Sequence, residues 1–452
     1  MRGALIVAAV LVALAGARVA RANDWLPHPA DATWTYSWSD TQYVKSAVKE
    51  KTTVGEQKGS SFTLHWTTDG LDNPSDAISS TGDVQFQDTP AGVINTNWSS
   101  TPPPPDFPVL CPSLACNNSL SSTWYFLIWG GRSPVLPEPL LAGSEWSGAG
   151  GAQGDVSSAN RYAGQEQLSV PAFPGPVTAA KVVSTITQAG ALGDPYGSGT
   201  RTVWWVFGVG PVKMTFQHAG GAGAPVTTAL LESTNQAPKP PPDDHNYFPL
   251  VKGRTLIYSW VNSKHLAKAE LEQFTVDSAA QASACFTVKS LSGPIKAAGS
   301  YGFSTRADGV TNLWGDTQAA TRVKFPPLGP SSLPVAKRRR FFTPFDLMTF
   351  GFNPLLPAYA SVGASWGSSP DTQDFLNYGV SGSTTITGFQ TVKVKAGTYH
   401  ALVVRSTLTQ PGFPFGSGKR TCWFAADVGL VKLVFKHADG SVTTAELVSA
   451  KQ

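Results

Sequence analysis

One block of sequence occurs twice in this 452-residue chain, and this repetition limits what the chain can fold into. The later copy runs from Thr421 to Leu447 and the earlier one from Thr202 to Leu231, with Thr, Trp, Val-Gly, Val-Lys, Phe and His in the same order. The spacing is constant through the block, because 421 − 202 and 437 − 218 both give 219. We therefore expect two copies of one folding unit rather than a single large domain.

Each copy of the block has the pattern of a β-hairpin. In the later copy Val431, Leu433 and Phe435 alternate with other residues, which is typical of a half-buried strand. Asp439-Gly440 then provides a favoured tight turn before a Thr-rich return strand. The chain has 44 Gly and 35 Pro and is only 14% charged, which favours many short strands over long helices. The sequence therefore predicts a mainly β protein with antiparallel strands.

The duplication extends far beyond this block. Tyr36-Ser-Trp38 matches Tyr258-Ser-Trp260, and Tyr196-Gly-Ser-Gly-Thr-Arg201 matches Phe415-Gly-Ser-Gly-Lys-Arg420. Residues 236–244 form a Pro-rich spacer that cannot join a sheet and should be semi-rigid. We therefore expect a β unit at 23–235 (the first unit), a linker at 236–244 and a second β unit at 245–452.

Residues 1–22 have the features of a secretory signal peptide. Arg2 precedes an apolar run that is too short for a comfortable membrane span, and Ala20-Arg21-Ala22 is a small-x-small cleavage site. We expect cleavage near Ala22 and a secreted, extracellular or cell-envelope protein with no further transmembrane segment; an uncleaved anchor is the alternative. Cleavage removes three arginines, which lowers the net charge from +4 to +1 (31 basic against 30 acidic residues). This charge gives no general argument for nucleic-acid binding.

Four cysteines in an exported chain favour disulfide bonds over metal ligands. Cys111 and Cys116 are close enough in sequence to close a loop, which leaves Cys285 and Cys422 to pair across the second unit. The first unit lacks both of the latter cysteines, which supports their pairing. On the chain-entropy model the long closure would stabilise the fold by about 5 kcal/mol and the short one by about 2 kcal/mol.

The motifs that suggest catalysis do not meet their structural requirements. Gly363-Ala-Ser365-Trp-Gly367 fits the nucleophile elbow of serine hydrolases, but the elbow needs a helix after the serine, and a loop-forming sequence follows here. His218 and His437 are equivalent in the duplication and have no ligand at metal spacing, which favours a structural role at a turn. We therefore expect a protein that is not an enzyme, with no catalytic residues, cofactor or metal.

Two loop-rich stretches hold the surface candidates. The first is Lys337, Arg338, Arg339 and Arg340, for which a solvated loop is the simplest interpretation. The alternative is a contact with an anionic envelope surface, since arginine matches phosphate oxygens. The second is Trp124-Tyr-Phe-Leu-Ile-Trp129, which we interpret as exposed aromatic residues on a long functional loop. The tryptophans that the duplication repeats, such as Trp38 and Trp260, are expected to lie mostly in the core.

The end of the second unit carries a family resemblance. Gly397-Thr-Tyr-His-Ala-Leu-Val-Val, Trp423-Phe-Ala and a hairpin ending at Glu446-Leu resemble a domain of uncharacterised exported bacterial proteins, the TapB-like envelope proteins. The match is weaker in the first unit, where Phe207 and Pro211 depart from the pattern. The resemblance implies an open, curved antiparallel sheet in each unit, similar to a half-barrel, and it brings no established activity.

Two hypotheses for function follow. The leading one is an apolar or lipid-like ligand held on the concave face of a curved sheet, under the Pro- and aromatic-rich loop. The alternative is a structural or adhesive surface protein that engages a glycan or a protein partner through its exposed loops. An internal apolar pocket would favour the first hypothesis, and a filled core would favour the second.

Overall fold

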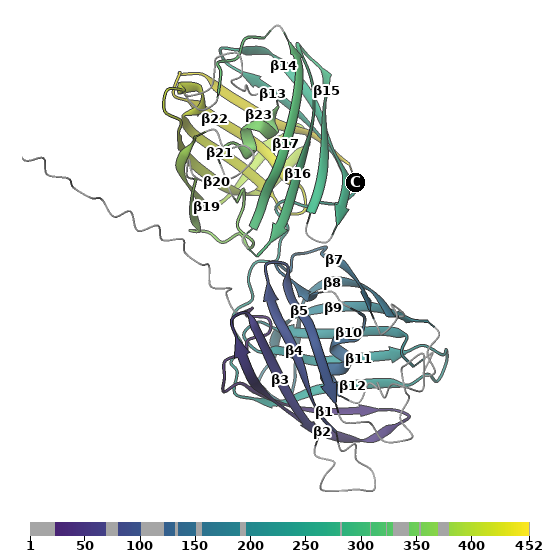
Figure 1. Ribbon diagram of the computed structural model, residues 1–452. Helices are drawn as coiled ribbons and strands as arrows, with labels where there is room; N and C mark the ends of the chain where they lie inside the picture. The colour runs from purple at the N-terminus through teal and green to yellow at the C-terminus, as the bar shows by residue number, and fades with distance from the viewer. Residues whose placement is uncertain are drawn as a thin grey trace, which may run out of the picture.

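The structure is a computed structural model that describes residues 23–68, 80–100, 122–131, 134–150, 156–189, 196–280, 283–307, 309–321, 323–328, 343–351, 354–368 and 379–451. Two large antiparallel sheets contain most of these residues (Figure 1). The mainly β fold and the curved antiparallel sheets predicted from the sequence are confirmed.

The first sheet has the spatial strand order β6-β5-β4-β3-β2-β1-β12-β11-β10-β9-β8-β7. Its strands are β1 (Thr33–Asp40), β2 (Val44–Lys58), β3 (Ser61–Thr68), β4 (Thr81–Thr89), β5 (Gly92–Ser100), β6 (Pro134–Pro137), β7 (Glu145–Gly150), β8 (Val156–Leu168), β9 (Val177–Gln188), β10 (Gly199–Val206), β11 (Gly210–His218) and β12 (Val226–Thr234). The outermost strands, β6 and β7, are joined directly by residues 138–144. Eight residue steps reach at most about 29 Å, whereas the edges of a flat sheet of this order would lie about 50 Å apart. The connection therefore requires the sheet to curl.

The second sheet repeats this arrangement in the order β17-β16-β15-β14-β13-β23-β22-β21-β20-β19-β18. Its strands are β13 (Thr255–Asn262), β14 (Leu266–Ala280), β15 (Ser283–Ser292), β16 (Ile295–Arg306), β17 (Gly309–Thr321), β18 (Ser365–Ser368), β19 (Ser381–Val394), β20 (Gly397–Thr409), β21 (Gly418–Ala425), β22 (Gly429–His437) and β23 (Val442–Lys451), with a 3-10 turn, η2, at Pro414–Gly416. In both sheets the first and last strands of the unit pair at the centre, β1 with β12 and β13 with β23.

Alternation along the strands gives each unit its own core. In β1 every second residue is buried, and Trp34, Tyr36 and Trp38 are at most 1% exposed. Their counterparts in β13, Tyr258 and Trp260, are buried to the same extent, so the prediction that the repeated tryptophans are core residues is confirmed for this pair. Two separate apolar clusters result, one inside each sheet.

A short helix of the chain itself packs against the concave face of each sheet. These helices are α1 (Thr123–Ile128) and α2 (Pro344–Thr349), which begin after the N-cap residues Ser122 and Thr343. Trp124 and Phe126 of α1 are 0% exposed, so the prediction that residues 124–129 form an exposed aromatic loop is wrong. Apolar side chains on every side of the helix axis require a helix that is surrounded by protein.

The predicted disulfide between Cys285 and Cys422 is not formed, because both cysteines are free thiols. Cys285 lies on β15 and Cys422 on β21, and β14, β13, β23 and β22 separate these strands in the sheet. Burial raises the pKa of the Cys422 thiol to about 11, which keeps it protonated and unreactive at neutral pH. Cys111 and Cys116 lie outside the described residues.

The two units meet through corresponding loops. The β4–β5 turn of the first unit accepts a hydrogen bond at Pro90 O from Ala307 N in the β16–β17 turn of the second, 2.9 Å away. These turns are counterparts in the duplication, since 307 − 90 and 309 − 92 both give 217. Tyr359 of the second unit completes the contact: its hydroxyl accepts from Trp25 Nε1 at 3.3 Å and from Leu140 N at 3.0 Å.

Replacing Tyr359 by phenylalanine should loosen this contact. The backbone N–H of Leu140 loses its acceptor, and we expect a cost of about 1–3 kcal/mol for the uncompensated group. Hydrogen exchange at the Leu140 amide measures the effect and should speed up by about tenfold or more. Tyr399→Phe is the matched control, because the Tyr399 hydroxyl bonds within the second unit, to Ala396 O. Equal exchange at Leu140 in both variants would show that Tyr359 does not hold the units together.

Candidate functional site

The nucleophile-elbow interpretation of Ser365 fails on geometry. Ser365 begins β18, which pairs antiparallel with β19, and its Oγ lies 2.7 Å from Thr385 Oγ1. A nucleophile elbow would place the serine between a parallel strand and a helix, and every strand pair in the described residues is antiparallel. The hydrolase motif therefore loses the context that it needs.

A buried arginine holds the C-terminal end of α1. Arg201 on β10 is 8% exposed, and its Nη1 donates to the carbonyl oxygens of Phe126 at 2.5 Å, Leu127 at 2.7 Å and Trp129 at 2.5 Å. The last carbonyls of a helix have no partner within the helix, and a cation there also suits the helix dipole. Burial lowers the pKa of Arg201 to about 10, so the side chain is still charged at neutral pH.

The second unit repeats this contact. Arg420 on β21 is 1% exposed and donates through Nη1 to Leu347 O of α2, and burial lowers its pKa to about 10 as well. Sequence reasoning missed both arginines as structural residues, although a partial signal was present. The Gly-Ser-Gly-x-Arg-Thr segment is repeated in both units, but by itself this repeat only marks the duplication and gives the arginine no role.

A buried glutamate holds the opposite end of α1. Glu50 on β2 is 0% exposed, and its Oε2 accepts from Thr123 N at 3.0 Å, in the first turn of the helix. Burial raises the pKa of Glu50 to about 8. Its counterpart Glu272 is equally buried, its pKa is also raised by burial, and it accepts from Trp260 Nε1 at 3.1 Å. A pair of buried ionisable residues on the sheet thus brackets the helix of the first unit.

The raised pKa of Glu50 makes the stability of the first unit depend on pH. The unfolded carboxyl ionises near 4.5 and the folded one near 8, so the stabilising effect is complete below pH 4.5 and is lost as the pH rises to 8. This interval corresponds to about 4–5 kcal/mol in the free energy of unfolding. Glu50→Gln should remove most of this slope, and denaturation between pH 5 and 8.5 measures it. The control is Glu56→Gln, at an exposed position on the same strand, and identical slopes in wild type and Glu50→Gln would refute the assignment.

The two equivalent histidines are structural, as the sequence suggested. His218 Nδ1 contacts Tyr196 O at 2.5 Å and its Nε2 contacts Thr227 Oγ1 at 2.8 Å; His437 makes the same two contacts with Phe415 O and Thr443 Oγ1. Burial lowers the pKa of both rings, to about 4 for His437. Each histidine thus connects the segment before the first strand of its hairpin (β10 or β21) to the strand that follows the hairpin (β12 or β23).

The two units differ in the residue that pairs with the threonine next to this histidine. In the first unit Thr227 donates to Asp40 Oδ2 at 2.7 Å, whereas in the second unit Asn262 Nδ2 donates to Thr443 Oγ1 at 2.9 Å. Asp40 and His218 are 0% and 2% exposed, so this Thr-His-Asp group cannot reach a substrate in the closed fold. It resembles a catalytic triad in composition only.

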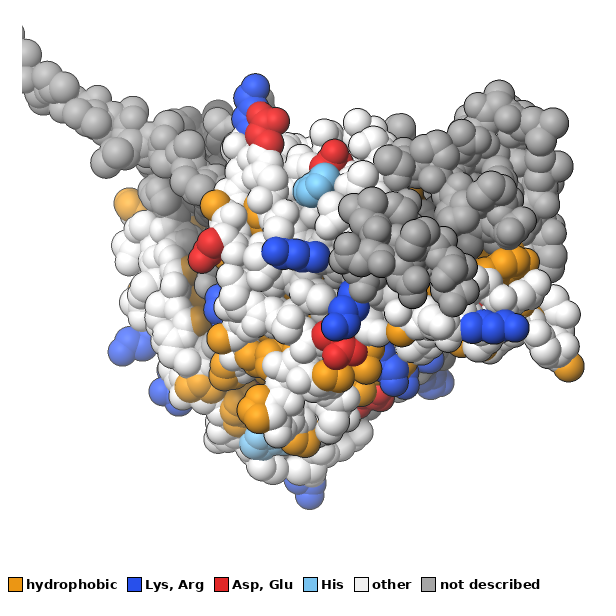
Figure 2. Space-filling model, turned by 90° about the horizontal axis from the view of Figure 1, so that it is seen from below, with side chains coloured by type: hydrophobic (Ala, Val, Ile, Leu, Met, Phe, Trp, Pro, Cys, Tyr) orange, Lys and Arg blue, Asp and Glu red, His pale blue; other side chains and the backbone are white. Residues whose placement is uncertain are grey.

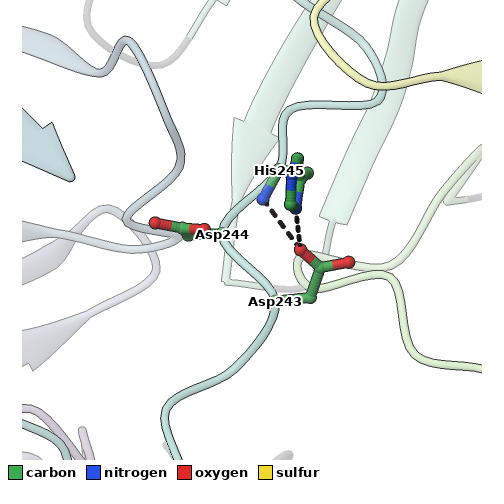
Figure 3. A group of neighbouring side chains, drawn as sticks. All are labelled: Asp243, Asp244 and His245. Atoms are coloured by element: carbon green, nitrogen blue, oxygen red, sulfur yellow. Dashed lines mark hydrogen bonds and ion pairs between the residues drawn. The ribbon is translucent and has the colours of Figure 1, made fainter. Parts of the chain in front are cut away.

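Three metal-type side chains meet in the linker region, at Asp243, Asp244 and His245 (Figure 3). Asp243 Oδ1 accepts from the main chain of His245 at 3.0 Å and contacts its ring nitrogen at 2.5 Å. The Asp244 carboxylate extends to the other side of the chain and accepts from the Tyr162 hydroxyl. These bonds already account for the arrangement of the group, which fastens the linker to the first unit and to itself.

A cavity of about 10 Å³ lies at the C-terminal end of α1, between Leu127, Trp129, Ser158, Asn160 and Arg201. A cavity of this volume holds about one water molecule.

The four basic residues Lys337, Arg338, Arg339 and Arg340 lie outside the described residues, so the structure does not test the prediction that they contact an anionic surface.

Comparisons with known proteins add little. No protein-family model matches the chain, and no curated protein sequence matches it. Two solved structures align with 46% of the chain: an exported protein with a YmcC-like fold from Bacteroides fragilis (13% identity, 100% of that chain, TM-score 0.22) and a lipoprotein from Parabacteroides distasonis (14% identity, 99% of that chain, TM-score 0.21). Likenesses at these TM-scores carry no argument about this chain, and the TapB-like resemblance stays a prediction. In the described residues, no helix has the length and apolar character that crossing a membrane requires.

Proposed function

We propose that the protein is an exported, non-enzymatic structural or adhesive protein that engages its partner through outer surfaces and loops rather than through its interior. The observation that carries this proposal is the filled concave face of each sheet. Trp124 of α1 packs edge-on against Trp34 and Tyr36 with ring centroids 6.3 and 6.1 Å away. In the second unit, the ring centroid of Phe345 on α2 lies 3.5 Å from that of Phe274. The place where a lipid-like ligand would sit is thus taken by side chains of the chain itself.

The hypothesis of an apolar ligand on the concave face would need the helices to leave. That movement would break the contacts of Arg201 and Glu50 at the two ends of α1 and expose four aromatic or aliphatic side chains that are at most 4% exposed: Trp124, Tyr125, Phe126 and Leu127. The cost of exposing one such side chain is about 1.5–3 kcal/mol, so the filled state is strongly favoured. This energetic cost favours the structural or adhesive function over ligand storage.

The outer surface exposes apolar side chains that are suited to contact with a partner. Figure 2 shows apolar side chains gathered in the lower part of one face, with basic and acidic side chains scattered around them. Contiguous exposed apolar patches rimmed by polar residues mark interaction sites when they are large. A glycan or protein partner fits this surface, and the basic segment 337–340 remains our proposed contact with an anionic envelope surface.

Native mass spectrometry of the exported protein, followed by lipid extraction, tests the proposal. We expect the mass of the mature chain without a lipid, both before and after extraction. A stoichiometric lipid mass that extraction removes would overturn the proposal in favour of ligand storage. The variant Trp124→Ala is a useful comparison, because the space it creates in the core could admit a small apolar molecule that the wild-type protein excludes.

A further inference from the structure

We propose that Asn97 is an N-glycosylation acceptor, whose side-chain amide receives an oligosaccharide when the chain passes through a secretory pathway. The inference rests on the export that the proposed function includes. Asn97-Trp98-Ser99 has the acceptor pattern Asn-x-Ser. The chain contains two other Asn-x-Ser triplets. Asn73-Pro-Ser75 is excluded by its proline, and Asn117-Asn-Ser119 lies outside the described residues.

The side chain of Asn97 faces solvent on the outer surface of the first sheet. It lies on β5 opposite Gln85 of β4, and both residues are exposed. The next residue, Trp98, pairs with the buried Val84 and therefore points to the inner face, where its ring lies 5.2 Å from that of Tyr125. A glycan on Asn97 would thus extend away from the core, while Trp98 keeps its contact with α1.

The strand is also open at the position of the acceptor. β6 pairs with only Gly92, Val93 and Ile94 of β5, so no strand in the described chain covers the outer edge of β5 from residue 95 onward. Among the described residues, the Nδ2 atom of Asn97 makes no hydrogen bond. An uncovered edge strand can pair with another chain, and bulky polar groups on it prevent such pairing. A glycan at Asn97 would give this edge that protection.

The chemistry is a group transfer from a lipid-pyrophosphate-linked oligosaccharide. The Asn97 Nδ2 atom forms a bond to the anomeric carbon of the sugar and loses one proton. The bond from that carbon to the pyrophosphate oxygen breaks, and the lipid pyrophosphate leaves with the electron pair. No oxidant or reductant is involved, and the hydroxyl of Ser99 is the second requirement of the acceptor pattern.

The test is expression of the mature chain, from Asn23, in insect cells behind a leader that the host recognises. Host export then does not depend on residues 1–22, and a failed glycosylation cannot be confused with failed export. Secreted protein is treated with the amidase that removes N-glycans and leaves aspartate, and the peptide that contains residue 97 is weighed. We expect Asn97 to be converted to aspartate in more than half of the secreted molecules.

Three variants make the result specific. Asn97→Gln and Ser99→Ala should lose the glycan from this peptide, whereas Ser99→Thr should keep it. All four proteins should have the same β-sheet circular dichroism, since both substituted side chains face solvent. Folded, secreted wild-type protein with an unmodified Asn97 would overturn the proposal, whether or not Asn117 carries a glycan.

Discussion

Replacing Arg201 by alanine should lower the free energy of unfolding of the first unit by about 3–5 kcal/mol. Three carbonyl oxygens at the end of α1, those of Phe126, Leu127 and Trp129, lose the donor that satisfies them. Each buried carbonyl left without a partner costs about 1–3 kcal/mol, and the relief of the buried charge offsets part of the sum. Urea denaturation followed by tryptophan fluorescence measures the change.

Arg161→Ala is the matched control for this prediction. Arg161 lies on β8 of the same sheet but is exposed, so its removal should change the free energy of unfolding by no more than about 0.5 kcal/mol. Arg201→Lys should fall between the two, because a lysine ammonium can replace Nη1, which reaches the carbonyls, but not Nη2, which donates to Ser184 Oγ at 3.3 Å. If Arg201→Ala were as mild as the control, the arginine would not be what holds the helix.

Replacing Trp124 by alanine should cost a similar amount, about 3–5 kcal/mol, for a different reason. The indole is 0% exposed, it touches the rings of Trp34, Tyr36 and Phe86, and its Nε1 donates to Thr52 Oγ1 at 2.7 Å. Its loss leaves a large cavity on the concave face and an unpaired hydroxyl. The same denaturation experiment measures this change.

Trp98→Ala provides the comparison for Trp124. Trp98 belongs to the same unit and is 37% exposed, so its removal should cost clearly less, about 1–2 kcal/mol. Equal costs for the two variants would mean that α1 contributes no more to the core than a side chain at the sheet edge. That result would also weaken the proposed function, which depends on the filled interior.

The sequence predicted the sheets well because their information is local and repeated. Alternation in segments such as 431–435 identifies strands, and the duplication shows that both halves share one architecture. The centre of each sheet could not be predicted in this way. The pairing of β1 with β12 joins residues such as Tyr36 and Leu231, which are almost a full unit apart in sequence.

The filled interior was missed because a short buried helix has no amphipathic pattern. Trp124-Tyr-Phe-Leu-Ile is apolar throughout, and in isolation such a segment resembles an exposed loop or a strand as much as a helix. The caps gave a partial signal, since Ser122 and Thr343 are favoured N-cap residues that accept from the first turns of α1 and α2. The buried Glu50 and Arg201 become meaningful only once the sheet places them at the two ends of the helix.

The central claim is that α1 occupies the concave face of the first sheet as a fixed part of the core. Hydrogen exchange of the backbone amides of Phe126 and Trp129 measures this most directly, because these amides donate to Ser122 O and Tyr125 O within the helix. The account predicts protection comparable to that of the central strands β10 and β11. Exchange at the rate of an unstructured segment would contradict it and would reopen the concave face as a ligand site.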